Sequence, residues 1–186
     1  MLLVRHATTP ETRAARFPLP DRDADPASLA RAAAALAPMT AGSAGWTGPA
    51  VAARQTAAAI GLEARVAPAL AEVDVGRWRG LPYERVAREE PDALASWLTD
   101  PHVVPHGGES LTAHAGRVAR WLDLVRAEPG VVAVCDAGTI RAAIGHALGL
   151  DPLGAALFDL APLSVTELLA TRDGWRVAYV NRKAPQ

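Results

Sequence analysis

Two short apolar runs in this sequence end abruptly in side chains that could do chemistry. Residues 2–4 lead directly into Arg5 and His6, and residues 131–135 lead into Asp136. Such runs are typical of strands buried at the centre of a sheet. A guanidinium binds anions, an imidazole acts as nucleophile or base, and a carboxylate moves protons. Because ligands of parallel sheets bind beyond the carboxyl ends of the strands, these residues mark a candidate site.

A third candidate segment covers residues 69–81. It mixes Glu72, Asp74, Gly76 and Gly80 with apolar residues and shows neither a helical nor a strand period. This composition predicts an ordered loop, because glycines and short acidic residues favour turns. We expect that loop to contribute to a site.

The rest of the chain predicts the elements that position these side chains. Helices are expected over residues 27–37, 50–62, 83–98, 111–126 and 140–148, and strands over 2–4, 65–68, 131–135, 164–170 and 175–180, the last two forming a hairpin. The proline-rich residues 8–26 are expected to form a surface loop. Strands that alternate with helices indicate a three-layer α/β/α sandwich with a mostly parallel central sheet. We expect a single domain over residues 1–186.

The composition excludes several classes of protein. The chain has 186 residues, 50% of them hydrophobic, which excludes a disordered chain. Its 19 basic and 20 acidic residues leave no positive surplus for nucleic acid or an anionic membrane. No apolar stretch approaches the roughly 20 residues of a membrane-spanning helix. The N-terminus lacks the pattern of a signal peptide and Cys135 is the single cysteine, so we expect a cytoplasmic protein.

Several segments, in this order along the chain, carry a resemblance to a known family. They are residues 3–9 (LVRHATT), residues 49–57, Leu70-Ala71-Glu72 with Gly76 and Trp78, residues 107–110 (GGES), residues 132–141 and the closing hairpin. Together they resemble the histidine phosphatase (phosphoglycerate mutase-like) superfamily, in its small bacterial phosphatase branch. The resemblance covers essentially the whole chain.

The resemblance implies phosphoryl transfer in two steps. His6 would attack phosphorus to give a phosphohistidine, which water would then hydrolyse. Arg5 would bind the phosphate and Glu72 would protonate the leaving oxygen. The family pattern also implies that no cofactor or metal is needed, and that the substrate is a small phosphorylated molecule.

Two positions depart from the family pattern. Aligning Pro49 and the Gln-Thr pair at 55–56 puts Ala52 where the pattern has a phosphate-binding arginine, and Asp136 stands where it has a second histidine. Arg54 is a candidate substitute, but two positions along a helix are about 200° apart, so its side chain faces away from the Ala52 side. His106, beside the two glycines at 107–108, is a second candidate cation. On this count Arg5 alone would face the phosphate beside Asp136.

The residues leave alternatives open. Asp136 precedes a helix, so it either caps that helix, stays protonated beside a bound anion, or acts as a base. His102, His114 and His146 are expected at the surface or in helix packing. His6, Glu72 and Asp136 have metal-ligand chemistry without supporting spacing, so a metal site is not expected.

Two functions follow from these observations. The first is a phosphomonoester hydrolase acting through His6, with reduced or redirected activity. The second is a catalytically silent or repurposed relative that uses the pocket to bind or transform a less anionic metabolite. The oligomeric state is left open.

Overall fold

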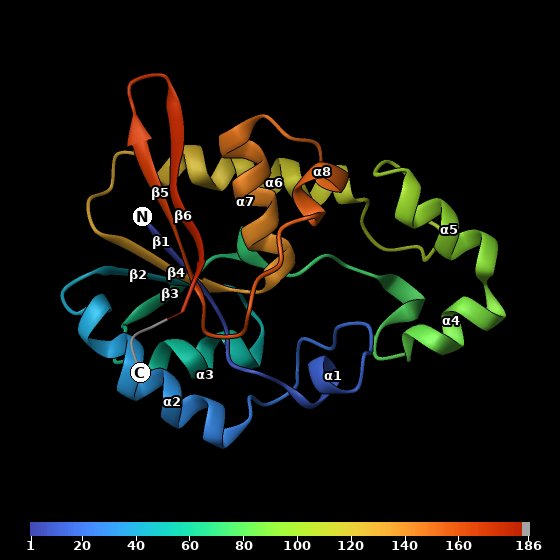
Figure 1. The fold of residues 1–186 in the computed structure, drawn as a ribbon, viewed down its shortest axis with the longest axis horizontal. Helices are drawn as coiled ribbons and strands as arrows, with labels where there is room; N and C mark the ends of the chain where they lie inside the picture. The colour runs from blue at the N-terminus through green and yellow to red at the C-terminus, as the bar shows by residue number, and fades with distance from the viewer. Residues whose placement is uncertain (184–186) are drawn as a thin grey trace.

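The protein is described from a computed structural model, which describes residues 1–183; residues 184–186 of the expected domain lie outside the described part. A sheet of six strands in the order β3-β2-β4-β1-β5-β6 runs through the centre (Figure 1). The strands are β1 (Leu2–Arg5), β2 (Ala44–Thr47), β3 (Ala64–Val66), β4 (Val131–Cys135), β5 (Val165–Thr171) and β6 (Gly174–Arg182). The first four are parallel to one another, and β5 and β6 add an antiparallel hairpin. The expected fold class is confirmed.

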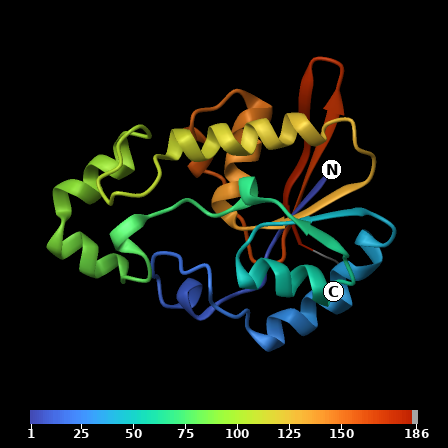
Figure 2. The ribbon, with the colours of Figure 1, turned by 180° about the vertical axis from the view of Figure 1, so that it is seen from behind.

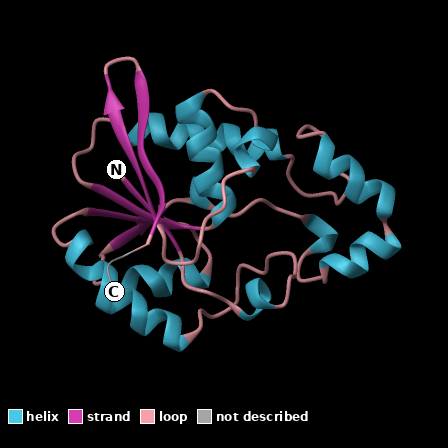
Figure 3. Ribbon diagram, viewed as in Figure 1, coloured by secondary structure: helices cyan, strands magenta, loops and turns pink. Residues whose placement is uncertain are grey.

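Helices cover both faces of the sheet (Figures 1 and 3). The helices are α1 (Pro10–Arg13), α2 (Pro26–Thr40), α3 (Val51–Ala59), α4 (Tyr83–Glu89), α5 (Pro91–Thr99), α6 (Leu111–Val125), α7 (Ala137–Leu148) and α8 (Pro152–Ala156), with short 3₁₀ turns at Pro68–Leu70 and Gly76–Trp78. Because successive side chains of a strand point to opposite faces, β1 sends Leu3 to the core under α6 and α7, and Val4 to the core under α2 and α3.

A third, smaller core lies beside the sheet. Phe17, Val75, Trp78 and Val86 are buried together, and Trp97 packs against them. This cluster holds α4 and α5, which stand apart from the layers around the sheet in both views (Figures 1 and 2). The expected ordered loop at residues 69–81 crosses from the main sheet to this cluster; it begins within the first 3₁₀ turn and contains the second.

The structure corrects four element predictions. The helix expected over residues 83–98 is two helices, because Glu90 takes a non-helical conformation (φ −136°, ψ 54°) directly before Pro91. Strand β2 was not expected, and its Gly45 lies so close to the neighbouring strand that a Cβ there would be 2.5 Å from the Glu63 carbonyl oxygen. Helix α7 begins at Ala137, three residues earlier than expected. Helix α1 lies within the region expected to be loop.

Candidate functional site

The parallel pairing of β1 and β4 brings the two polar strand ends together. Arg5 pairs with Cys135 in the register, and the backbone N–H of His6 donates to the Cys135 carbonyl at 2.9 Å. Arg5, His6 and Asp136 therefore emerge side by side at the carboxyl edge of the sheet. This is where the sequence predicted the site.

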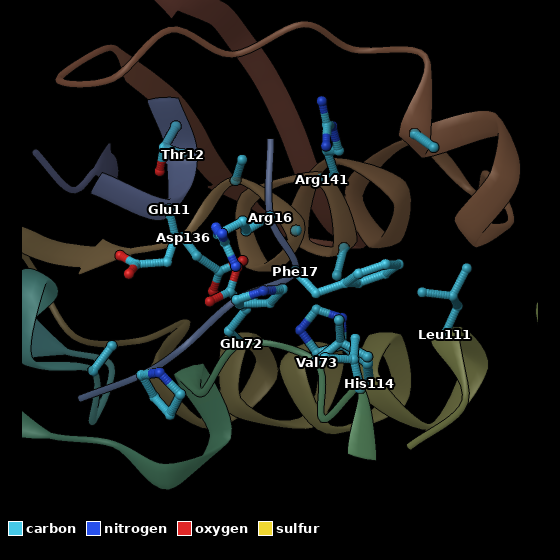
Figure 4. Close-up of a pocket in the computed structure, with 18 of the residues that line it drawn as sticks. Glu11, Thr12, Arg16, Phe17, Glu72, Val73, Leu111, His114, Asp136 and Arg141 are labelled. Atoms are coloured by element: carbon cyan, nitrogen blue, oxygen red, sulfur yellow. The ribbon is translucent and has the colours of Figure 1, made fainter. Parts of the chain in front are cut away.

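A cavity of about 430 Å³ opens at this edge, a volume that suits a small-molecule ligand. Arg5, His6, Glu72 and Asp136 all line it. The far wall is apolar and comes from the loop around Phe17, from α4 and α5, and from Leu111 at the start of α6. Figure 4 shows Glu72 and Asp136 close together, with Phe17 and Leu111 toward the other end. The structure thus gathers four of the six predicted site residues.

Two features of its surroundings define the state of His6. Its Nδ1 lies 2.8 Å from the Ala7 carbonyl oxygen. A carbonyl can only accept, so Nδ1 carries the proton and Nε2 keeps its lone pair. Burial lowers the pKa of His6, helped by the charge of Arg5 and opposed by the Ala7 carbonyl and Asp136. At neutral pH the imidazole is therefore uncharged and nucleophilic at Nε2.

Glu72 has the opposite electrostatic setting. Burial raises its pKa well above the ordinary value, the negative charge of Asp136 raises it further, and Arg5 opposes both. Glu72 therefore holds its proton at a pH where an exposed glutamate has lost it. A protonated carboxyl inside a cavity can donate a proton to a leaving oxygen.

Asp136 caps helix α7. Its Oδ1 accepts a hydrogen bond from the backbone N–H of Thr139 at 2.9 Å, and its Oδ2 accepts one from the Thr139 hydroxyl. This geometry bears out the capping interpretation of Asp136. The residue is only 4% exposed and still lines the cavity.

The structure does not bring Arg54 to the cavity. On α3 the buried Ala52 faces the cavity, whereas Arg54 is exposed. The rotation of about 200° between the two positions accounts for this difference. Ala52 packs against Ala7 and Ala24, so no cation from this helix reaches the cavity in the described part of the chain.

His106 is likewise absent from the described residues that line the cavity. Its ring is 2% exposed and packs at 5.0 Å from Trp78 and 6.1 Å from Trp97, centroid to centroid. Its Nδ1 accepts a hydrogen bond from the Gly108 N–H at 3.1 Å. His106 thus builds the aromatic core under α4 and α5.

Sequence reasoning missed several charged or polar groups of the cavity. Arg16, Arg22 and Arg141 join Arg5 in its lining. Arg22 forms an ion pair with Glu11 at 3.3 Å, and Glu11 also lines the cavity. Arg141 follows Ala137 by four positions on α7, and residues four positions apart share a helix face. This spacing is the sequence signal that predicts Arg141 near the cavity.

His114 was expected in helix packing or at the surface. It packs on the buried side of its helix, and it also lines the cavity. It is 4% exposed, lies on the buried face of α6 and lines the cavity (Figure 4). A Cβ on Gly138 would lie 3.0 Å from Asp136 Oδ1 and 3.7 Å from His114 Cε1, so these two residues flank the same glycine. Burial lowers the pKa of His114, and Asp136 opposes that effect.

No group of three or more histidine, cysteine, aspartate or glutamate side chains in residues 1–183 is arranged to hold a metal ion. No helix of this part of the chain is long and apolar enough to cross a membrane.

Comparison with known proteins places this geometry in context. The profile of the histidine phosphatase superfamily (branch 1) matches residues 1–183. The chain is 36% identical over 84 residues to phosphoserine phosphatase 1 of Hydrogenobacter thermophilus, covering 43% of this chain and 40% of that protein. It is 32% identical over 101 residues to glucosyl-3-phosphoglycerate phosphatase of Mycobacterium tuberculosis, covering 54% and 45%.

A solved structure agrees over nearly the whole chain. Mycobacterial glucosyl-3-phosphoglycerate phosphatase in complex with VO3 is 26% identical and superposes with a TM-score of 0.84, covering 98% of each chain. The chain spans only 33% to 45% of the length of the curated relatives it matches.

Proposed function

Because the chain belongs to the histidine phosphatase superfamily (branch 1), we propose that it hydrolyses small phosphomonoesters through a phosphohistidine on His6. The observation that supports this most directly is the fixed tautomer of His6. With Nδ1–H bound to the Ala7 carbonyl, the Nε2 lone pair is free to attack phosphorus in a cavity lined by arginines. No cofactor takes part in the proposed reaction.

In the first step Nε2 of His6 forms a bond to phosphorus as the bond from phosphorus to the ester oxygen breaks. The leaving oxygen takes the proton of Glu72, whose raised pKa keeps that proton available. Arg5 faces the charge on the phosphoryl oxygens. Charge there must be neutralised because phosphoryl transfer spreads it over three equatorial oxygens.

In the second step water attacks the phosphohistidine. Glu72, now a carboxylate, takes a proton from the water as its oxygen bonds to phosphorus and the bond from phosphorus to Nε2 breaks. Inorganic phosphate leaves, and His6 and Glu72 return to their starting protonation states. Glu72 therefore serves as acid and then as base, as the reversal of one proton transfer requires.

The charges around the cavity support reduced or redirected activity. Asp136 places a carboxylate near the phosphoryl position, and two unit charges about 4 Å apart repel by roughly 4 kcal/mol at an effective dielectric of about 20. Arg16 and Arg141 offset part of this repulsion. The balance favours substrates that reach these two arginines over simple phosphate dianions.

A second candidate function is a binding protein without turnover. Its support is the absence of a cation at Ala52 together with the use of Asp136 as a helix cap. Under this alternative the cavity binds a less anionic metabolite, and His6 forms no bond to phosphorus.

Turnover of an aryl phosphate separates the two candidates. The hydrolase proposal expects release of inorganic phosphate by the unaltered protein, its loss in His6→Ala, and its retention in His102→Ala, which removes an exposed histidine outside the cavity lining. The binding alternative expects no release from the unaltered protein and gain of turnover on combining Ala52→Arg with Asp136→His. Equal activity in His6→Ala and the unaltered protein would contradict the hydrolase proposal.

A further inference from the structure

We propose that Arg117 is a positioning residue for Glu72, and that it holds this acid in place through the backbone of the loop that carries it. The inference rests on the proposed phosphatase function, because Glu72 is the acid of that reaction. Arg117 is not among the described residues that line the cavity. It therefore acts on the reaction through Glu72 and touches no substrate.

The carboxyl of Glu72 depends on its own backbone for its position. It lies in the cavity close to Asp136 (Figure 4), and within residues 1–183 no hydrogen bond joins it to another group. The residue belongs to an irregular segment between the 3₁₀ turns Pro68–Leu70 and Gly76–Trp78. A group that fixes the backbone of this segment therefore also fixes the direction of the acid.

Arg117 fixes that backbone at two carbonyl groups. From α6, its Nη1 donates to the Ala69 carbonyl at 2.7 Å and its Nη2 donates to the Glu72 carbonyl at 3.1 Å. One planar guanidinium thus joins the start of the segment to the residue that carries the acid. The spacing on α6 allows this, because Arg117 follows His114 by three positions and His114 lines the cavity.

Glu109 holds the guanidinium of Arg117 in place. Its two carboxyl oxygens accept hydrogen bonds from Nε and Nη2 of Arg117 at 2.8 and 2.9 Å. The Arg117 and Glu109 side chains are only 19% and 21% exposed, and a bidentate pair of this kind fixes the plane of the guanidinium. The Glu109 backbone N–H also donates to the Asp74 carbonyl at 2.7 Å, on the other side of Glu72. The acid therefore lies between two fixed points of the backbone.

The influence of Arg117 on Glu72 is geometric. Burial is the largest cause of the raised pKa of Glu72, and the charges that act on it are those of Asp136 and Arg5. Loosening the segment admits water to the carboxyl and lowers that pKa. A misplacement of about 1 Å costs up to roughly 100-fold in rate. Loss of Arg117 should therefore weaken the proton transfer and leave the phosphoryl-binding groups in place.

The test compares two substrates that differ in their need for an acid: an alkyl phosphate and an aryl phosphate with an acidic phenol. Arg117→Ala should lower kcat/KM for the alkyl phosphate by about 10–100-fold and change that for the aryl phosphate by less than about threefold. The alkaline limb for the alkyl phosphate should move to lower pH. A loss of folded protein lowers kcat/KM for both substrates equally, so the ratio separates positioning from a merely structural role.

Two milder variants and a control complete the test. Arg117→Lys keeps the charge without the planar fork, so it should show a smaller loss for the alkyl phosphate. Glu109→Gln weakens the pair that orients Arg117 and should change the ratio in the same direction. Both variants keep the test decisive if Arg117→Ala does not fold. Arg120→Gln changes an exposed arginine of the same helix and should leave the ratio unchanged.

The proposal is overturned if the folded variants of Arg117 lower kcat/KM for both esters to the same extent, or for neither. Failure of the proposed function is recognised separately, because the unaltered protein then releases no phosphate. In that case the pKa of Glu72 still tests the positioning, by NMR of an isotope-labelled carboxyl assigned with Glu72→Gln. That pKa should fall in Arg117→Ala and stay in Arg120→Gln, and an unchanged pKa in Arg117→Ala would overturn the proposal.

Discussion

The replacement Asp136→Asn tests the electrostatic coupling between the two carboxyl groups of the cavity. The negative charge of Asp136 is the second cause, after burial, of the raised pKa of Glu72. A charge about 4–8 Å away contributes roughly 2–4 kcal/mol at an effective dielectric of about 20. Removing this charge takes away one cause of the raised pKa and leaves the opposing effect of Arg5 unchanged, so the pKa of Glu72 should fall.

The assay is the pH dependence of kcat/KM for an alkyl phosphate, which needs a protonated acid. Activity falls on the alkaline side as Glu72 loses its proton, so Asp136→Asn should move that limb to lower pH. The acid limb should move in the same direction, because Asp136 also raises the pKa of His6. Asparagine caps helices about as well as aspartate. We therefore expect Asp136→Asn to lower the free energy of unfolding by at most about 1 kcal/mol.

A matched control comes from the cap of α8. Asp151 accepts a hydrogen bond from the Gly154 N–H at 2.7 Å, as Asp136 does from Thr139, but it is exposed and does not line the cavity. Asp151→Asn should therefore leave both limbs in place. An unmoved alkaline limb in Asp136→Asn, or equal shifts in the two variants, would refute the assigned coupling.

Three other outcomes are expected. Glu72→Gln should lower kcat for an alkyl phosphate by about 10²–10⁴-fold in steady-state kinetics. The loss should be much smaller for an aryl phosphate, whose acidic phenol leaves without a proton. Equal losses for the two substrates would contradict the role of Glu72 as acid. Because the fold raises the pKa of Glu72, the unfolding free energy should fall as pH rises from about 4.5 through the raised pKa, and urea titrations of Glu72→Gln should lack this decline. Because burial lowers the pKa of His114, stability should fall as pH drops below about 6.5, and His114→Phe should remove that part of the loss; an unchanged acid profile would show that His114 is not the group responsible.

The sequence predicts the centre of the site well because local signals are strong there. The apolar run before Arg5 and His6 and the one before Asp136 are typical of buried strands, and parallel pairing brings their ends together. The same pattern could not reveal β2, whose Ala-Gly-Trp-Thr sequence has little strand character. Strand β2 forms because it pairs in parallel with β3 on one side and with β4 on the other.

The wall of the cavity is harder to predict from sequence. Arg16 reaches it through the course of an irregular loop, and His114 through the packing of α6 against α7, so both depend on contacts between distant segments. His106 had the right residue type next to two glycines, yet aromatic packing with Trp78 and Trp97 takes it out of the cavity lining. Residue type and spacing therefore indicate the reacting groups better than the groups that select a substrate.

The most direct test of the account is to trap the intermediate. The protein is mixed with a phosphomonoester carrying labelled phosphorus, quenched in alkali within one turnover, and analysed by peptide mass spectrometry. We predict a phosphoryl group on His6 that is stable in alkali and lost in acid, absent from His6→Ala and longer-lived in Glu72→Gln. Steady turnover with an unlabelled His6, or with label on another residue, would contradict the account.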